Sequence, residues 1–174
     1  MITIREMALE DVDRVCELEE MAFSMPWHKE SFIEMIENKD ALYLVADEKQ
    51  AGVVGCCGVR SIVGEGDITN VVVHPDFRKK GVAYEMLTHL LSRGERDFGI
   101  KEFTLEVRLS NIGAIHLYEK LGFYYPFLHM NLQINHYYLL IHHQLTEFRY
   151  YYMSDQQCYL NNSSNSFQRY KSVQ

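Results

Sequence analysis

Hydrophobic and polar positions follow two different periods along residues 1–123 of this chain. Short apolar segments rich in β-branched residues predict strands, whereas apolar residues that recur every three or four positions predict amphipathic helices. Strands are predicted at residues 2–5, 41–47, 51–63, 68–73 and 103–107, and helices at residues 8–22, 28–38 and 111–121. A further helix is predicted after the turn at residues 78–83, with Met86, Leu87, Leu90 and Leu91 at helical spacing. The order β-α-α-β-β-β-α-β-α predicts one α/β domain, with a central sheet flanked by helices.

Glycines interrupt two of these elements. Gly52, Gly55 and Gly58 lie in the third strand, where they predict bulges or close backbone approach rather than a flat ladder. Gly94 and Gly99 are expected to flank the end of the third helix.

The segment DITNVVVHPDFRKKGVAYEMLTHLL, residues 67–91, predicts a strand, a tight basic turn and a helix in direct succession. Pro75 ends the strand, because proline fixes φ and carries no N–H donor. The first N–H groups of a helix have no partner within it, and the helix dipole favours negative charge there. Gly81 and Ala83 leave this backbone open to a phosphate, although a basic turn of this kind also fits an ordinary solvated helix start.

Two segments carry a family resemblance. The first, VVVHPDFRKKGVA, is similar to the acyl-coenzyme A signature of the GNAT superfamily of N-acetyltransferases, Arg/Gln-x-x-Gly-x-Gly/Ala after a strand. The second, FTLEVRLSNIGAIHLYEKLGF at residues 103–123, resembles a later part of the same fold at the expected distance. Its LEVR-x-SN wording most resembles the RimI type, whose members acetylate the N-terminal alanine of ribosomal protein S18. The resemblance covers residues 1–123, about 70% of the chain.

The resemblance implies a GNAT fold of the α/β (α+β) class, with a mixed central sheet, and acetyl-CoA as cosubstrate. It implies that the backbone of the central strand pairs with the pantetheine arm, and that the turn and helix start hold the diphosphate. The residues so implied in acetyl-CoA binding are Val71, Val72, Val73, Lys79, Lys80, Gly81, Val82, Ala83, Tyr84 and Asn111.

The resemblance also implies two catalytic residues. Glu106 matches the glutamate proposed as general base in RimI-type members. Its neighbours Leu105 and Val107 are expected to point to the opposite face of the sheet. An ion pair with Arg108 or Lys101 is the structural alternative. Tyr118 matches the tyrosine proposed to protonate the departing thiolate of CoA, and a packed helix tyrosine is the alternative. Asn111 is expected to cap the last helix and to bind pantetheine, two roles that are compatible.

The acceptor side is less defined by the sequence. The segment FSMPW, residues 23–27, resembles a stretch that lines the acceptor cleft in this type, but Trp27 also fits a residue that covers the core beside Phe32. The helix before it carries an acidic face that is expected to be solvated, formed by Asp11, Asp13, Glu17, Glu19 and Glu20.

Charge and cysteine content exclude several classes. The formal net charge of −7 argues against a non-specific nucleic-acid binder. The four cysteines are Cys16, Cys56, Cys57 and Cys158. Their spacing fits no zinc pattern, and the adjacent pair within a strand predicts buried core. Because no signal-peptide pattern or membrane-length apolar run is present, we expect a cytoplasmic protein with no membrane partner.

Residues 124–174 differ in composition from the rest of the chain. They contain neither glycine nor alanine, whereas residues 1–123 hold all ten glycines, and the ending typical of the family is not recognisable. A frame change in the gene, or a misplaced exon or stop, is one hypothesis for this departure. The domain is therefore assigned to residues 1–123 by resemblance.

The same region still carries strand periodicity. Alternation at residues 128–135 predicts a strand, and residues 136–145 predict a partner, so residues up to about 148 are expected to complete the sheet. Polar residues 153–174 are expected to form a disordered tail. The histidines at alternating positions here are interpreted as structural rather than as a metal site, and they are His129, His136, His142 and His143.

Three functions remain open from the sequence. The first is transfer of acetyl to a protein N-terminal α-amine, with the alanine of ribosomal protein S18 as the acceptor implied by resemblance. The second is acetylation of a small amine such as a polyamine, amino sugar or amino acid. The third is a non-catalytic acetyl-CoA-binding protein whose altered C-terminus prevents transfer.

Overall fold

The computed structural model describes residues 1–131 and 136–144, with side chains described up to Tyr124. The elements in chain order are β1 (Ile2–Glu6), η1 (Leu9–Asp11), α1 (Val12–Ala22), α2 (Lys29–Glu37), β2 (Ala41–Glu48), β3 (Gly52–Ile62), β4 (Glu65–Val73), η2 (Pro75–Phe77), α3 (Val82–Phe98), β5 (Glu102–Arg108), α4 (Ile112–Lys120), β6 (Tyr124–Asn131) and β7 (His136–Gln144). The predicted order of strands and helices is confirmed.

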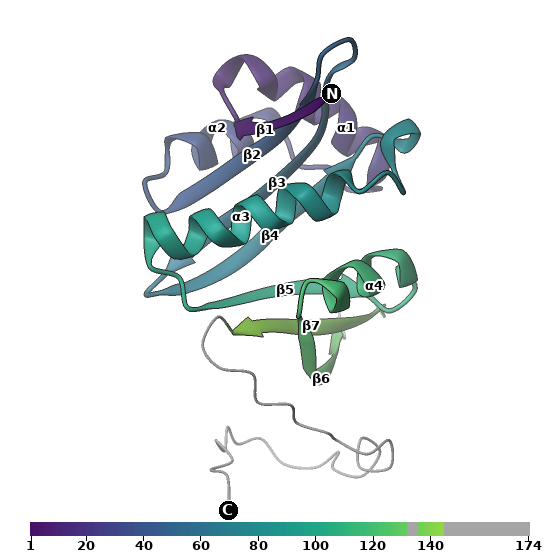
Figure 1. Ribbon diagram of the computed structural model, residues 1–174. Helices are drawn as coiled ribbons and strands as arrows, with labels where there is room; N and C mark the ends of the chain where they lie inside the picture. Colours follow the sequence, from purple (N-terminus) through teal and green to yellow (C-terminus); the bar gives the residue numbers. More distant parts are fainter. Residues whose placement is uncertain (132–135, 145–174) are drawn as a thin grey trace, which may run out of the picture.

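The strands form one sheet in the order β1-β2-β3-β4-β5-β7-β6. Neighbouring strands are antiparallel except for β4 and β5, which are parallel. Helices α3 and α4 lie in front of the sheet in Figure 1, and α1 and α2 lie behind it. The sheet is therefore covered on both faces.

Each face of the sheet has its own apolar core. The core on the α3 side is built around Met86, Leu87, Leu90, Phe103 and Leu105. The core on the α1 and α2 side is built around Val12, Val15, Leu18, Phe32 and Val45. Burial of these side chains removes apolar surface from water and supplies most of the stabilisation of the fold.

Helix α3 ends at Phe98, so Gly94 and Gly99 flank its end as predicted. Gly94 lies in the last part of the helix, and Gly99 is its left-handed C-cap at φ 65°. A Cβ on Gly94 would lie 2.7 Å from the ring of Phe103. The glycine therefore permits close packing of α3 on β5, and its position does not end the helix.

The acidic face predicted for the first helix is only partly solvated. Asp11 and Glu19 are buried, so the prediction is wrong for these two residues. Asp11 accepts hydrogen bonds from Arg5 at 2.7 and 2.8 Å and from the backbone N–H of Ala8 at 2.8 Å. The guanidinium of Arg5 holds the pKa of Asp11 below its ordinary value.

Gly55 and Gly58 of β3 have the structural roles that were predicted, whereas Gly52 begins the strand with a left-handed φ of 71° and has nothing within 4 Å of its Cβ position. Pairing with β2 shifts register opposite Gly55, and pairing with β4 shifts beyond Gly58 because Thr69 is an extra residue. A Cβ on Gly58 would lie 2.2 Å from the ring of Tyr43. That ring crosses β3, and its hydroxyl bonds the Thr69 hydroxyl at 2.6 Å. Tyr43 thus fastens the β-bulge in β4.

Strands β6 and β7 pair antiparallel with each other, and β7 pairs with β5 along the whole length of β5. The predicted pairing of residues 136–145 with the preceding strand is confirmed over His136–Gln144. Residues 132–135, the proposed tail at residues 153–174 and the side chains of the four histidines lie outside the described part of the chain.

Candidate active site

Strands β4 and β5 separate after three paired positions. Glu65, Gly66 and Asp67 pair with residues 102–104, and the two strands then diverge towards the right of Figure 1. The bulge at Thr69 comes directly after this point. Within the described chain, residues 70–73 of β4 pair only with β3. Their other backbone edge is therefore open to an extended ligand that adds to the sheet like a strand.

The turn after β4 holds a second set of backbone N–H groups that have no partner among the described residues. The Nε of Arg78 donates to the carbonyl of Val73 at 2.9 Å, which ties the turn to the end of the strand. Lys79 and Gly81 both have left-handed φ values, 59° and 85°. Left-handed residues at such spacing point successive N–H groups into one concavity, a known form of anion site.

Helix α3 begins at this concavity without a side-chain cap. Gly81 is the N-cap residue, and no side chain hydrogen-bonds the first turn. The N–H groups of Val82, Ala83 and Tyr84 are therefore directed to the position where the dipole favours an anion. A Cβ at Gly81 would meet nothing within 4 Å, so this surface is open. These features fit the diphosphate of a coenzyme A.

Two lysine side chains near the helix start are held over aromatic rings. Lys80 Nζ lies 5.1 Å from the ring centroid of Phe77, and Lys120 Nζ lies 4.7 Å from that of Tyr84. Such cation–π contacts orient the ammonium groups without neutralising them. The turn consequently keeps positive charge close to the free N–H groups, although the whole chain is acidic.

Glu106 extends from the part of β5 that has left β4. Its side chain is exposed, whereas those of Leu105 and Val107 are buried on the α3 side. In the described chain it forms no ion pair with Arg108 or Lys101, so the structural alternative for this residue is wrong. Among the residues with described side chains, Glu106 is thus a carboxylate without an ion pair, on the α1 and α2 side of the sheet.

Tyr118 lies on the other face of β5. It comes from α4, is 7% exposed and packs with the core that contains Leu105 and Val107. Its ring lies 5.7 Å from that of Phe123. Burial raises the pKa of Tyr118 to about 12, so its phenol is protonated at neutral pH.

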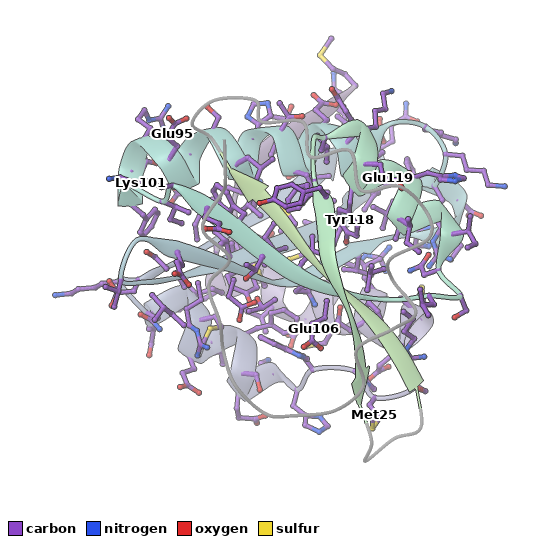
Figure 2. All side chains as sticks on the ribbon, turned by 90° about the horizontal axis from the view of Figure 1, so that it is seen from below. Met25, Glu95, Lys101, Glu106, Tyr118 and Glu119 are labelled. Atoms are coloured by element: carbon purple, nitrogen blue, oxygen red, sulfur yellow. The ribbon has the colours of Figure 1, made fainter. Side chains whose placement is uncertain are left out.

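Figure 2 shows these two residues in one view. Tyr118 lies towards α3, and Glu106 lies towards the side of α1 and α2, where Met25 also projects. A ligand that passes between the separated strands would therefore have the phenol on one side and the carboxylate on the other. The geometry can supply a proton donor and a proton acceptor to the two ends of a transfer reaction.

Asn111 is the N-cap of α4. Its side-chain oxygen accepts from the backbone N–H of Ala114 at 3.3 Å, which confirms the predicted capping role. A contact of Asn111 with the pantetheine arm remains a prediction.

The segment at residues 23–27 joins α1 to α2 on the carboxylate side of the sheet. Trp27 is half-buried, and its ring lies 5.6 Å from that of Phe32 and 6.5 Å from that of Tyr43. The core-covering role of Trp27 is confirmed. Phe23 and Met25 are exposed, so the same segment also presents apolar side chains to a substrate.

Sequence reasoning missed a buried polar pair beside this segment. Asn70 of β4 donates through Nδ2 to Glu19 of α1 at 2.7 Å, and both side chains are buried. The signal was present, because Glu19 lies four residues after Val15 and three before Ala22, in the apolar stripe of the helix. A carboxylate at a core position is costly unless it has hydrogen-bond partners.

The open edge of β4, the N–H groups at α3 and the Glu106–Tyr118 arrangement fit one class of protein, the transferases that take an acyl group from an acyl-coenzyme A. Residues 12–123 match the acetyltransferase (GNAT) family. The chain belongs to this family, which confirms the fold inferred by resemblance, and GNAT acetyltransferases use acetyl-CoA as cosubstrate. The protein is an acetyl-CoA-dependent N-acetyltransferase.

Similar proteins include the RimI type inferred from the sequence. A putative ribosomal protein bS18-alanine N-acetyltransferase of Bacillus subtilis is 37% identical over 121 residues, covering 68% of this chain and 78% of that protein. The ribosomal protein bS18-alanine N-acetyltransferase of Escherichia coli K12 is 32% identical over 124 residues, covering 71% and 81% respectively. The crystal structure of the ribosomal-protein-S18-alanine N-acetyltransferase from Escherichia coli matches with a TM-score of 0.73 at 23% identity, over 86% of this chain and 97% of that one.

Two further predictions can be compared with the structure. Cys56 and Cys57 are buried and not disulfide-bonded, and burial raises the pKa of both thiols. The prediction that they belong to the core is confirmed. Over the described residues, every helix is too short or too polar to cross a membrane.

Proposed function

We propose that this protein transfers the acetyl group of acetyl-CoA to the N-terminal α-amine of a protein, with the alanine that begins ribosomal protein S18 as acceptor. The observation that carries the proposal is the placement of Glu106 and Tyr118 on opposite faces of β5, beside the open edge of β4. The two relatives above are named for this acceptor, and their alignments cover more than two thirds of each chain.

Acetyl-CoA supplies an activated thioester carbonyl. Residues 71–73 of β4 bind its pantetheine arm through the open backbone edge, and Asn111 adds a side-chain contact. The N–H groups between Lys79 and Tyr84 hold the diphosphate, with Lys80 contributing charge. An amide of β4 also polarises the carbonyl oxygen, because a fixed N–H dipole stabilises negative charge that develops there.

Glu106 acts as the general base. The acceptor is an α-ammonium with a pKa of about 7.7–8.0, so a fraction of it gives up its first proton to solvent near neutral pH, and Glu106 takes the second proton from nitrogen as the C–N bond forms. The carboxylate is available for this role, because it is exposed and lacks an ion pair in the described chain. It lies on the α1 and α2 side, from which the acceptor approaches.

Tyr118 acts on the leaving side. A thiol has a pKa of about 8.5 by analogy with cysteine, so the thiolate is a competent leaving group. A phenol with a pKa of about 12 stays protonated and donates a hydrogen bond to the sulfur as negative charge develops there. Tyr118 therefore stabilises the departing thiolate and returns a proton to it.

The acceptor approaches past residues 23–27. Phe23 and Met25 offer apolar contact to an extended peptide, and a ribosomal acceptor places the reaction in the cytoplasm. We infer further that residues 1–123 with β6 and β7 form the catalytic domain, because β7 completes the sheet beside β5.

A thiol-release assay tests this function. The intact chain is given acetyl-CoA with a short peptide that begins with alanine, with the same peptide blocked at its N-terminus, or with spermidine. We expect release with the free peptide alone. Release with spermidine but not with the peptide would favour a small-amine acetyltransferase. Binding of acetyl-CoA without transfer to either amine would favour a non-catalytic protein.

A further inference from the structure

Glu19 and Asn70 form a polar pair in an otherwise apolar core. Glu19 is 1% exposed and Asn70 is 6% exposed. The carboxylate of Glu19 accepts from Asn70 Nδ2 at 2.7 Å and from the backbone N–H of Trp27 at 3.3 Å. Among the described residues no cation pairs with this carboxylate, and burial raises its pKa. Such a pair needs an explanation beyond stability, because apolar residues would pack more favourably there.

The carboxylate determines how the Asn70 amide is oriented. The Nδ2 of Asn70 faces Glu19 at 2.7 Å and donates to a carboxylate oxygen there. The Oδ1 atom is then directed elsewhere, and it is buried with no partner in the described chain. Unpaired buried acceptors are rare in folded proteins, and they are found where a ligand or water completes the arrangement.

Asn70 is level with Glu106 on the same face of the sheet. Asp67 pairs with Thr104, which places Ile68 beside Leu105. Both of these side chains belong to the core on the α3 side. Thr69 is the extra residue of the bulge, so the next position along each strand is Asn70 on β4 and Glu106 on β5.

The side chains of these two residues lie on the face covered by α1 and α2. Asn70 donates a hydrogen bond to Glu19 on α1. Glu106 lies between Leu105 and Val107, which are buried on the α3 side, so its side chain points to the opposite face. The two separated strands therefore present two acceptor groups on the side from which the acceptor amine approaches.

An attacking amine needs two such acceptors. Loss of one proton from an α-ammonium leaves a neutral amine with two N–H groups and one lone pair. When both N–H groups are held by fixed acceptors, the lone pair has a single direction. That direction is productive when it faces the thioester carbonyl.

We propose that Asn70 contacts the acceptor amine, and that its Oδ1 accepts one N–H while Glu106 takes the transferred proton. Glu19 is the positioning residue that fixes the Asn70 amide. This inference rests on the proposed function, because it requires an acceptor that approaches from the α1 and α2 side. It accounts for a buried carboxylate at a site where the fold alone needs an apolar side chain.

A matched pair of double variants tests the inference. In E19Q/N70D the amide introduced at position 19 can donate to the carboxylate introduced at position 70, which leaves one oxygen of that carboxylate as an acceptor for the amine. In E19Q/N70L the same amide is present at position 19, but the side chain at position 70 has no acceptor. Each variant is measured for thermal unfolding, for acetyl-CoA affinity by calorimetry, and for kcat and KM with a peptide that begins with alanine.

We expect both variants to bind acetyl-CoA like the unchanged protein. E19Q/N70L should have a KM for the peptide roughly ten- to a hundredfold higher than that of E19Q/N70D, the usual effect of one hydrogen bond to a charged or reacting group. If E19Q/N70L does not fold, E19Q/N70A is scored in the same way.

Equal KM values in the two variants would overturn the inference and leave Asn70 as a structural partner of Glu19. Failure of the unchanged protein to acetylate the peptide is a different result, because it would remove the proposed function and this inference together. The two failures are therefore distinguished by the unchanged protein alone.

Discussion

The carboxylate of Glu106 and the phenol of Tyr118 lie on opposite faces of β5 (Figure 2). This relationship follows from strand alternation, because Glu106 is directed away from Leu105 and Val107, against which the core containing Tyr118 packs. It becomes chemically useful only because β4 leaves β5 after Asp67, so that a ligand can lie between the two groups. Separation of the strands is therefore the feature on which the proposed mechanism depends.

Replacement of Glu106 by Gln is expected to reduce turnover by ~10²–10⁴-fold, the usual contribution of a positioned general base. Acetyl-CoA affinity should stay close to that of the unchanged protein, because the base acts on the acceptor. Glu102→Gln on the same strand is the control and should have little effect on rate. Single-turnover rates near pH 7 decide the matter, and an E106Q rate equal to that of the unchanged protein would remove Glu106 from the mechanism.

Replacement of Tyr118 by Phe removes one oxygen and should slow transfer by about 10²-fold, the lower end of the range for a positioned acid, since the thiolate also leaves unaided. The phenol has a pKa of about 12, so it does not titrate at lower pH. The ratio of unchanged to Y118F rates should thus be constant between about pH 6 and pH 10. A ratio that declines with a midpoint in this range would contradict the assignment.

Acetyl-CoA affinity should depend more on Gly81 than on Lys79. Both residues have left-handed φ values, but Gly81 adopts its value without strain, whereas a side chain there would cost about 1–2 kcal/mol. Gly81→Leu should distort the N–H concavity and weaken acetyl-CoA binding, while Lys79→Ala removes only one exposed charge. Titration calorimetry on both variants makes the comparison, and equal losses would indicate binding through side-chain charge.

Gly58→Ala should destabilise the protein by about 1–3 kcal/mol, because the new Cβ would collide with the ring of Tyr43 at 2.2 Å. Movement of that ring would also release the bulge at Thr69. Gly113→Ala is the matched control, since it lies in α4 with nothing within 4 Å of its Cβ position. It should be neutral or stabilising by up to about 1 kcal/mol. Thermal unfolding compares the two, and a stable G58A would show that Tyr43 does not hold β4 rigidly.

Much of the fold could be predicted because its elements have clear periodicity. The strand–turn–helix around Gly81 is local, so each of its features follows from neighbouring residues. The packing role of Gly94 was less predictable, because it depends on Phe103, which lies on β5 and not in the helix.

Residues of the candidate active site could be predicted only where a short local motif identifies them. Glu106 and Tyr118 are recognisable within LEVR and LYEKLGF. Glu19 and Asn70 are 51 positions apart in the sequence. The residues around each of them do not indicate which distant residue it contacts. Likewise, the bond from Tyr43 to Thr69 depends on a bulge that only the pairing of β3 and β4 defines.

Mapping of the acetylated position tests the central claim most directly. The intact protein is incubated with acetyl-CoA and a peptide that begins with alanine and also contains an internal lysine, and the product is fragmented by mass spectrometry. The account predicts one acetyl group on the N-terminal alanine, with loss of this product in E106Q. Acetyl on the lysine side chain, or an unmodified peptide in the presence of bound acetyl-CoA, would contradict it.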